Sequence, residues 1–112
     1  MTKIYHNPRC SKSRAALALL QERGFNPEII EYLKNPLDAE QIKALIAQSN
    51  LSVRDVMRTN EDVYSTLGLE QADDERLIQA MVENPILLNR PLVQTEKGVR
   101  LGRPLEAIED IL

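Results

Sequence analysis

Cys10 is the only cysteine of the chain and the side chain best suited to nucleophilic chemistry. It directly precedes a predicted helix, where free backbone N–H groups and the helix dipole favour a thiolate over a thiol. Arg9, Lys12 and Arg14 add positive charge around it. A free thiol has a pKa of about 8.5, and such positions commonly lower it by one or more units. We therefore predict an exposed, reactive Cys10 in a strand-to-helix loop; a buried structural cysteine is the alternative.

The segment Cys10-Ser11-Lys12-Ser13 has a C-x-x-S spacing. If Ser11 or Ser13 caps the helix that follows, the thiol lies at the N-terminus of that helix. A dithiol redox motif needs a second cysteine that closes on the first, and the chain contains none. If Cys10 is catalytic, its oxidised form must therefore be resolved by a thiol from outside the chain.

His6 is the only histidine and lies four residues before Cys10. An imidazolium ion near the sulfur would stabilise the thiolate and so assist a catalytic cysteine. A surface histidine, or a core histidine with satisfied hydrogen bonds, explains the same residue without any catalytic role.

Arginine accounts for nine of the 14 basic residues. A guanidinium group binds tetrahedral oxyanions through a fixed fork of donors that lysine cannot copy. Arg90 and Arg103 each precede a proline, and both flank a predicted hairpin. A proline that enters a hairpin strand can form a cis peptide bond that fixes a tight turn near a site. Taken alone, each of these arginines also fits a solvated surface charge.

The composition is that of one ordinary globular domain. A length of 112 residues leaves too little chain for two independent cores, and 43% hydrophobic with 28% charged residues excludes a disordered chain. Nucleic-acid binders usually have an excess of basic residues, whereas this chain has a net charge of -3. No apolar run approaches the roughly 18 residues of a membrane span. One cysteine and one histidine are too few ligands for a structural zinc site, so we expect none. We expect a cytoplasmic protein that has neither nucleic-acid nor membrane partners.

A strand, a helix and a strand must position the thiol loop. Residues 2–5 form a predicted buried strand, residues from 13 onward have helical composition up to a stop at Gly24, and residues 28–32 form a second strand. These elements occupy about 30 residues, which is typical of a parallel, right-handed βαβ unit.

The middle of the chain, about residues 38–84, is predicted to be helical. Four polar positions indicate helix starts: Asp38 with Gln41, Ser52 with Asp55, Asn60, and Asp73. Pro85 ends the last of these helices.

The last part of the chain changes from helix to strand. Residues 92–101 form a predicted β-hairpin with a glycine in its turn, and Pro104 starts the final helix. The order is βαβ, several helices, then ββα. We therefore predict a single α/β domain over residues 1–112, a thioredoxin-like fold with a four-stranded mixed sheet, interrupted by a helical insertion at about 38–84.

Five collinear segments resemble the glutaredoxin-coupled arsenate reductases of the ArsC family, within the ArsC/Spx-like thioredoxin-fold superfamily. The segments are His6-Asn7-Pro8-Arg9-Cys10 with Ser13-Arg14, Glu31-Tyr32-Leu33-Lys34-Asn35-Pro36, Ser52-Val53-Arg54 through Arg58, Asn84-Pro85-Ile86-Leu87-Leu88-Asn89-Arg90-Pro91, and Gly98-Val99-Arg100-Leu101-Gly102-Arg103-Pro104. Together they cover nearly the whole chain.

The resemblance implies a thioredoxin-like fold with a helical insertion. It also implies the reduction of arsenate to arsenite, with glutathione as reductant, glutaredoxin as partner, and no bound cofactor. By position, Cys10 matches the nucleophile that attacks arsenic, and His6 matches the residue that helps to keep the cysteine ionised.

The same resemblance assigns further residues. The three arginines that hold the oxyanion correspond to Arg58, Arg90 and Arg103. Pro91 corresponds to a cis-proline that faces the active-site loop, and the motif's supporting residues are Ser13 and Arg14. We expect the protein to act as a monomer.

The chain departs from the family directly after the cysteine. Family members typically carry Gly-Thr there, whereas this chain has Ser11-Lys12. A glycine lets the backbone approach an anion closely, so Ser11 narrows that approach, while Lys12 adds a helpful charge.

Two other functions fit the same residues. One is a thiol oxidoreductase of this fold with another substrate, such as a glutathionylated protein or a different small oxyanion. The other is a regulatory adaptor of the Spx type, which contacts RNA polymerase and often carries C-x-x-C as a redox switch. Ser13 in place of the second cysteine argues against such a switch, and the three arginines together favour an anion site.

Overall fold

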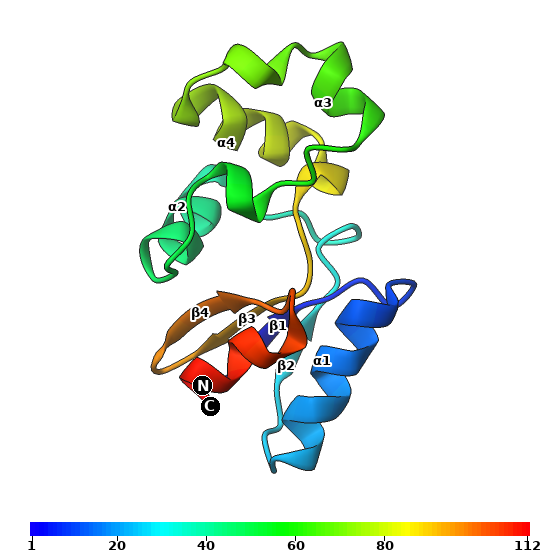
Figure 1. The fold of residues 1–112 in the computed structure, drawn as a ribbon, viewed down its shortest axis with the longest axis vertical. Helices are drawn as coiled ribbons and strands as arrows, with labels where there is room; N and C mark the ends of the chain where they lie inside the picture. Colours follow the sequence, from blue (N-terminus) through cyan, green and yellow to red (C-terminus); the bar gives the residue numbers. More distant parts are fainter.

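A four-stranded mixed sheet forms one end of the computed structural model, which describes residues 1–112 (Figure 1). The strands are β1 (Lys3–Tyr5), β2 (Glu28–Ile30), β3 (Leu92–Thr95) and β4 (Gly98–Leu101). Their order in the sheet is β2-β1-β3-β4. Strands β1 and β2 are parallel, whereas β3 is antiparallel to both β1 and β4. The predicted βαβ and ββ units are therefore confirmed and share one sheet.

The sheet separates two groups of buried side chains because neighbouring residues of a strand point to opposite faces. Ile4 and its cross-strand partner Val93 are fully buried in a small cluster of six residues. Helix α1 (Ser11–Glu22) and a final 3-10 helix (Leu105–Ile111) cover that face. Tyr5 belongs to the other cluster, which contains 18 residues.

The larger cluster joins the sheet to the helical part of the chain. That part contains α2 (Ala39–Ala47), α3 (Asp62–Thr66) and α4 (Asp74–Glu83), which lie beyond one side of the sheet (Figure 1). Four short 3-10 turns complete the pattern of helices: Arg54–Val56, Leu69–Gln71, Pro85–Leu87 and the final Leu105–Ile111. Buried side chains of α2 and α4 share the cluster with residues of β1, β3 and β4.

Main-chain bonds also connect the helical part to the sheet. The N–H of Val99 in β4 donates to the carbonyl of Gln48 just after α2, over 3.1 Å. Gly98 precedes it with φ +140°, and a Cβ there would lie 3.0 Å from the same carbonyl oxygen. The hairpin glycine is therefore required by both its backbone conformation and this close approach.

Several predicted helix ends are confirmed and others are wrong. Asp38 forms a capping box with Gln41, and Asp73 caps α4 by accepting from the N–H of Arg76. Helix α3, in contrast, follows Glu61, so Asn60 is not its cap.

Three predicted elements are shorter or tighter than expected. The segment after Ser52 forms one 3-10 turn, Arg54–Val56, and the final helix is 3-10 rather than α. Strand β2 ends at Ile30 because the chain turns at Glu31, whose carbonyl accepts from the N–H groups of Lys34 and Asn35. None of the helices combines the length and apolar character that a membrane crossing requires.

Candidate active site

Cys10 occupies the N-cap position of α1, at the end of the loop that leaves β1. Its own N–H donates to the carbonyl of Asn7 over 3.0 Å, so the loop turns tightly before the helix. Neither Ser11 nor Ser13 is the N-cap, but the thiol lies at the helix N-terminus as predicted. The cysteine is free but only 8% exposed, so the predicted exposed loop is wrong in this respect.

The surroundings of Cys10 favour its thiolate. Burial alone would raise the pKa of the thiol, but the N–H groups of Ser13 and Lys12 and the charges of Arg90 and Arg103 outweigh it, so the pKa is lowered. The guanidinium Nη2 of Arg103 donates to Sγ over 3.4 Å. A lowered pKa increases the fraction of thiolate, which is the nucleophilic form of the side chain.

His6 is buried, with 6% of its surface exposed, and contacts the same helix start. Its Nδ1 lies 2.7 Å from the hydroxyl of the fully buried Ser13. That hydroxyl also accepts from the N–H of Asn7 over 3.0 Å, which leaves its hydrogen free to be donated to a neutral ring. His6 and Ser13 therefore hold the loop and the helix in one arrangement.

The electrostatics of His6 correct the hypothesis of an imidazolium. Burial lowers its pKa, Glu31 raises it, and the charge of Arg14 lowers it, with a net decrease. The lowered pKa favours the neutral ring over the imidazolium, so the structure does not support a positively charged His6 beside the thiolate.

Arg14 and Pro91 shape the backbone next to Cys10 and next to Arg90, respectively. The Nη1 of Arg14 donates to the carbonyl of Pro8 over 2.9 Å, which ties the loop back to the first turn of α1. The bond between Arg90 and Pro91 is cis, as is the bond between Arg103 and the proline after it.

Arg58, Arg90 and Arg103 line one polar pocket of about 260 Å³. The remaining lining residues are Met57, Thr59, Asn60 and Asn89. Arg58 follows a 3-10 turn, Arg90 precedes β3, and Arg103 follows β4, so three distant segments meet here. Three guanidinium groups around a small polar space form an environment suited to a multiply charged oxyanion.

The three arginines differ in their existing contacts. Arg58 is paired with Glu61 over 2.8 Å. The Nε of Arg103 donates to the carbonyl of Arg90 over 2.7 Å, which links two of the arginines directly. The Nε of Arg90 is buried without a hydrogen-bond partner in the protein. Such an unsatisfied buried donor is rare and is consistent with a group that serves a ligand.

Asn89 was not identified from the sequence, although it lines the pocket. Its Oδ1 accepts from the N–H of Arg90 over 3.1 Å, and its own N–H donates to the carbonyl of Val56 over 2.8 Å. It therefore fixes the distance between the segments that carry Arg58 and Arg90. Its only sequence signal is its place directly before the arginine and proline.

Tyr32 was also missed. It is 2% exposed and follows β2, whose carboxyl end lies beside that of the parallel strand β1. Burial raises the pKa of its phenol, the charges of Arg90 and Arg58 lower it, and Cys10 raises it, with a net increase. The carboxyl ends of parallel strands meet at one edge of the sheet. The position of Tyr32 directly after the second strand could therefore have placed it near the loop that follows β1.

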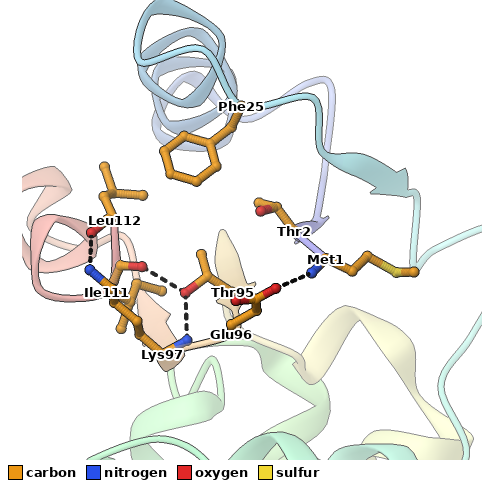
Figure 2. Close-up of a pocket in the computed structure, with 8 residues that line it drawn as sticks. All are labelled: Met1, Thr2, Phe25, Thr95, Glu96, Lys97, Ile111 and Leu112. Atoms are coloured by element: carbon orange, nitrogen blue, oxygen red, sulfur yellow. Dashed lines mark hydrogen bonds and ion pairs between the residues drawn. The ribbon is translucent and has the colours of Figure 1, made fainter.

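The largest pocket, about 290 Å³, lies at the other end of the strands (Figure 2). Met1 and Thr2, which precede β1, line it together with the β3–β4 turn and the end of the chain. Its polar groups contact one another: the N-terminal ammonium pairs with Glu96, and Nζ of Lys97 donates to the carbonyl of Leu112. It contains neither a cysteine nor an arginine. No group of three or more His, Cys, Asp or Glu side chains that could hold a metal is present.

Comparison with known proteins gives one consistent result. An arsenate reductase from Neisseria meningitidis is 46% identical over 98% of this chain and 97% of its own length. A protein from Escherichia coli K12, named uncharacterized protein YfgD, is 47% identical over 98% of this chain and 95% of its own. The structure of an arsenate reductase from Vibrio cholerae superposes with a TM-score of 0.94 at 44% identity, covering 99% of this chain and 97% of that one. The ArsC family model matches residues 5–111, and the chain belongs to the ArsC family.

Proposed function

We propose that this protein is an arsenate reductase, with Cys10 as its nucleophile. The observation that carries the proposal is the 3.4 Å contact between Nη2 of Arg103 and Sγ of Cys10. The same arginine lines the pocket that contains Arg58 and Arg90. The nucleophile therefore borders a site for a tetrahedral oxyanion. Relatives that carry the name arsenate reductase at about 45% identity support arsenate as that oxyanion.

In the first step, the Cys10 thiolate attacks arsenic. A sulfur–arsenic bond forms, an arsenic–oxygen bond breaks, and the leaving oxygen is protonated and departs as water. Arsenic remains As(V). An anion attacking an anion is repelled, and the charges of Arg58, Arg90 and Arg103 offset that repulsion while orienting the arsenic.

The reducing electrons must come from outside because the chain has one cysteine. A glutathione thiol attacks arsenic, its proton leaves with a second oxygen as water, and arsenic then carries two sulfurs. A glutaredoxin thiolate next attacks the glutathione sulfur. A disulfide forms between them, the glutathione–arsenic bond breaks, and its electron pair stays on arsenic, which becomes As(III). Water displaces Cys10 and arsenite leaves.

The neighbouring residues act by positioning in this scheme. His6 and Ser13 hold the loop against the start of α1, and Arg14 holds the carbonyl of Pro8. Pro91 separates Arg90 from β3 and accepts a bond from the N–H of Gly102, so it fixes the arginine beside the hairpin. No bound cofactor is required, since glutathione is consumed as a substrate. A reducing cytosol is the compartment that would supply it.

The test is an arsenite-formation assay in which glutathione and glutaredoxin are supplied separately and together. We expect sustained arsenite formation only with both donors, since each performs a different step. Equal rates with glutathione alone would remove glutaredoxin from the scheme. Absence of arsenite under all conditions, with folded protein, would contradict the proposed substrate.

A further inference from the structure

A third pocket, of about 250 Å³, adjoins the Cys10 loop and shares no residue with the arginine pocket. It is lined by His6, Asn7, Pro8, Arg9, Glu31, Leu33 and Lys34. These residues follow β1 and β2, whose parallel carboxyl ends lie side by side. Arg9 is the chain neighbour of Cys10, and the carbonyl of Asn7 accepts the N–H of Cys10. One wall of this pocket is therefore the loop that presents the sulfur.

The charges of this pocket are two positive and one negative. Lys34 and Glu31 form an ion pair of 3.4 Å at the surface, with the lysine side chain 77% exposed. Arg9 takes part in no ion pair. The His6 ring lines the pocket while its Nδ1 is engaged by Ser13. Leu33, 47% exposed, adds an apolar side.

An outside thiol must reach arsenic while the oxyanion occupies the arginine pocket. The body of that thiol therefore needs a second surface beside Cys10, and this pocket is one. We propose that it binds a small peptide thiol that carries two carboxylates and one ammonium group. Arg9 and Lys34 would receive the carboxylates and Glu31 the ammonium, so the charges of site and ligand are complementary. This inference rests on the proposed function, which requires an external thiol.

The size of the pocket agrees with such a ligand. Pockets that enclose drug-sized ligands measure about 300–1,000 Å³. At about 250 Å³, this pocket would hold the charged ends of a tripeptide-sized molecule and leave its thiol outside, toward Cys10.

The direct test measures binding of S-methylglutathione, which cannot react, to the full-length Cys10→Ser protein by calorimetry and by amide NMR shifts. We expect saturable binding with shifts at Asn7, Arg9 and Glu31. Arg9→Ala and Lys34→Ala should each weaken binding about tenfold, the order expected for a hydrogen bond to a charged group. Absence of saturable binding, or affinities that do not change in these variants, would overturn the proposal.

Lys43→Ala is the matched control, because Lys43 pairs with Glu40 at the same i,i+3 spacing as Lys34 with Glu31, but on α2. It should leave the affinity unchanged. Binding of S-methylglutathione does not depend on turnover. A failure of arsenate reduction would therefore contradict the proposed function, whereas the binding measurement would still test whether this pocket binds the thiol.

A kinetic test separates recognition of the charges from access to the sulfur. Arg9→Ala and Lys34→Ala should raise the KM for glutathione about tenfold and leave the KM for arsenate unchanged. The rate with the uncharged thiol 2-mercaptoethanol should not change. An equal loss with both thiols would show that the variants damage the loop, and would overturn the assignment of the two cations to carboxylates.

Discussion

The Nη2 of Arg103 lies 3.4 Å from the sulfur of Cys10, although 93 residues separate them in the chain. The Nε of the same side chain donates to the carbonyl of Arg90 over 2.7 Å. One guanidinium group therefore connects the thiol, the start of β3 and the arginine pocket. Because Arg103 follows β4, the native surroundings of the thiolate depend on the position of the hairpin.

Replacement of Arg103 should raise the pKa of Cys10. Arg103→Ala removes a positive charge and a hydrogen bond from the thiolate, while the N–H groups of Ser13 and Lys12 remain. Thiolate absorbance against pH, recorded for both proteins, measures the change. The activity of the wild type should fall as the pH drops through its lowered pKa, and that fall should move to higher pH in the variant.

Arg76→Ala is a suitable control for this titration. Arg76 is an exposed arginine of α4 that pairs with Glu83 and is not among the groups that act on Cys10, so its loss changes the net charge equally without removing a contact to the sulfur. Equal shifts in the two variants would assign the effect to net charge and refute the role of the contact.

Each pocket arginine should contribute to the transition state for attack on arsenic. Arg90→Ala should lower kcat/KM for arsenate by about 100-fold or more, the usual loss for a donor to a developing oxyanion. Arg90→Lys should recover little because lysine lacks the fork of donors. Steady-state kinetics of arsenite formation measure both effects.

Arg100→Ala provides the matched comparison. Arg100 also has a buried Nε without a hydrogen-bond partner, but it lies on β4 and does not line the pocket. Its loss should leave the KM for arsenate unchanged. Unchanged kinetics in Arg90→Ala would exclude that residue from the oxyanion site.

The burial of His6 predicts a loss of stability in acid. Because its folded pKa is lowered, the unfolded chain binds a proton as the pH falls through about 6.5, before the folded chain does. The stabilisation that the neutral His6 ring gives to the folded state is thus complete above pH 6.5. It is lost as the pH falls toward the lowered pKa of His6 in the folded protein. Urea unfolding at pH values on either side of 6.5 measures the free energy of unfolding. That free energy should decrease less with falling pH in His6→Gln than in the wild type. A decrease as steep as that of the wild type would contradict the buried neutral ring.

The proposed single domain predicts one unfolding transition. Leu77 of α4 is fully buried in the larger cluster, and Leu20 of α1 is fully buried in the smaller one. Leu77→Ala and Leu20→Ala should each lower the free energy of unfolding by about 2–5 kcal/mol. Circular dichroism and tyrosine fluorescence should report the same midpoint in both. A separate early transition in Leu77→Ala would show that residues 38–84 unfold on their own.

Local sequence signals predicted most of the fold but not the start of α1. The capping box of Asp38 and the glycine turn of the hairpin depend on neighbours in the chain, and both are present. Ser13 was a candidate N-cap, but its hydroxyl bonds the ring of His6, seven residues earlier, and Cys10 is the N-cap residue. A non-local partner replaced the local one.

The site was predictable only in part for the same reason. Cys10 could be selected from its type and position, and Arg90 and Arg103 from the prolines that follow them beside the predicted hairpin. Arg58 was added to them by the family resemblance alone. Their convergence on one pocket depends on tertiary structure that brings together the 3-10 turn before Arg58, the start of β3 and the end of β4. The burial of Cys10 and the lowered pKa of His6 both arise from tertiary contacts.

The central claim is tested most directly by arsenite formation in Cys10→Ser, compared with the wild type at saturating arsenate, glutathione and glutaredoxin. Circular dichroism and urea unfolding establish that the variant is folded. A serine hydroxyl is not ionised at neutral pH and cannot replace the thiolate. The account predicts steady arsenite formation by the wild type and none above the protein-free rate by the variant. Arsenite formation by folded Cys10→Ser at a rate near that of the wild type would contradict it.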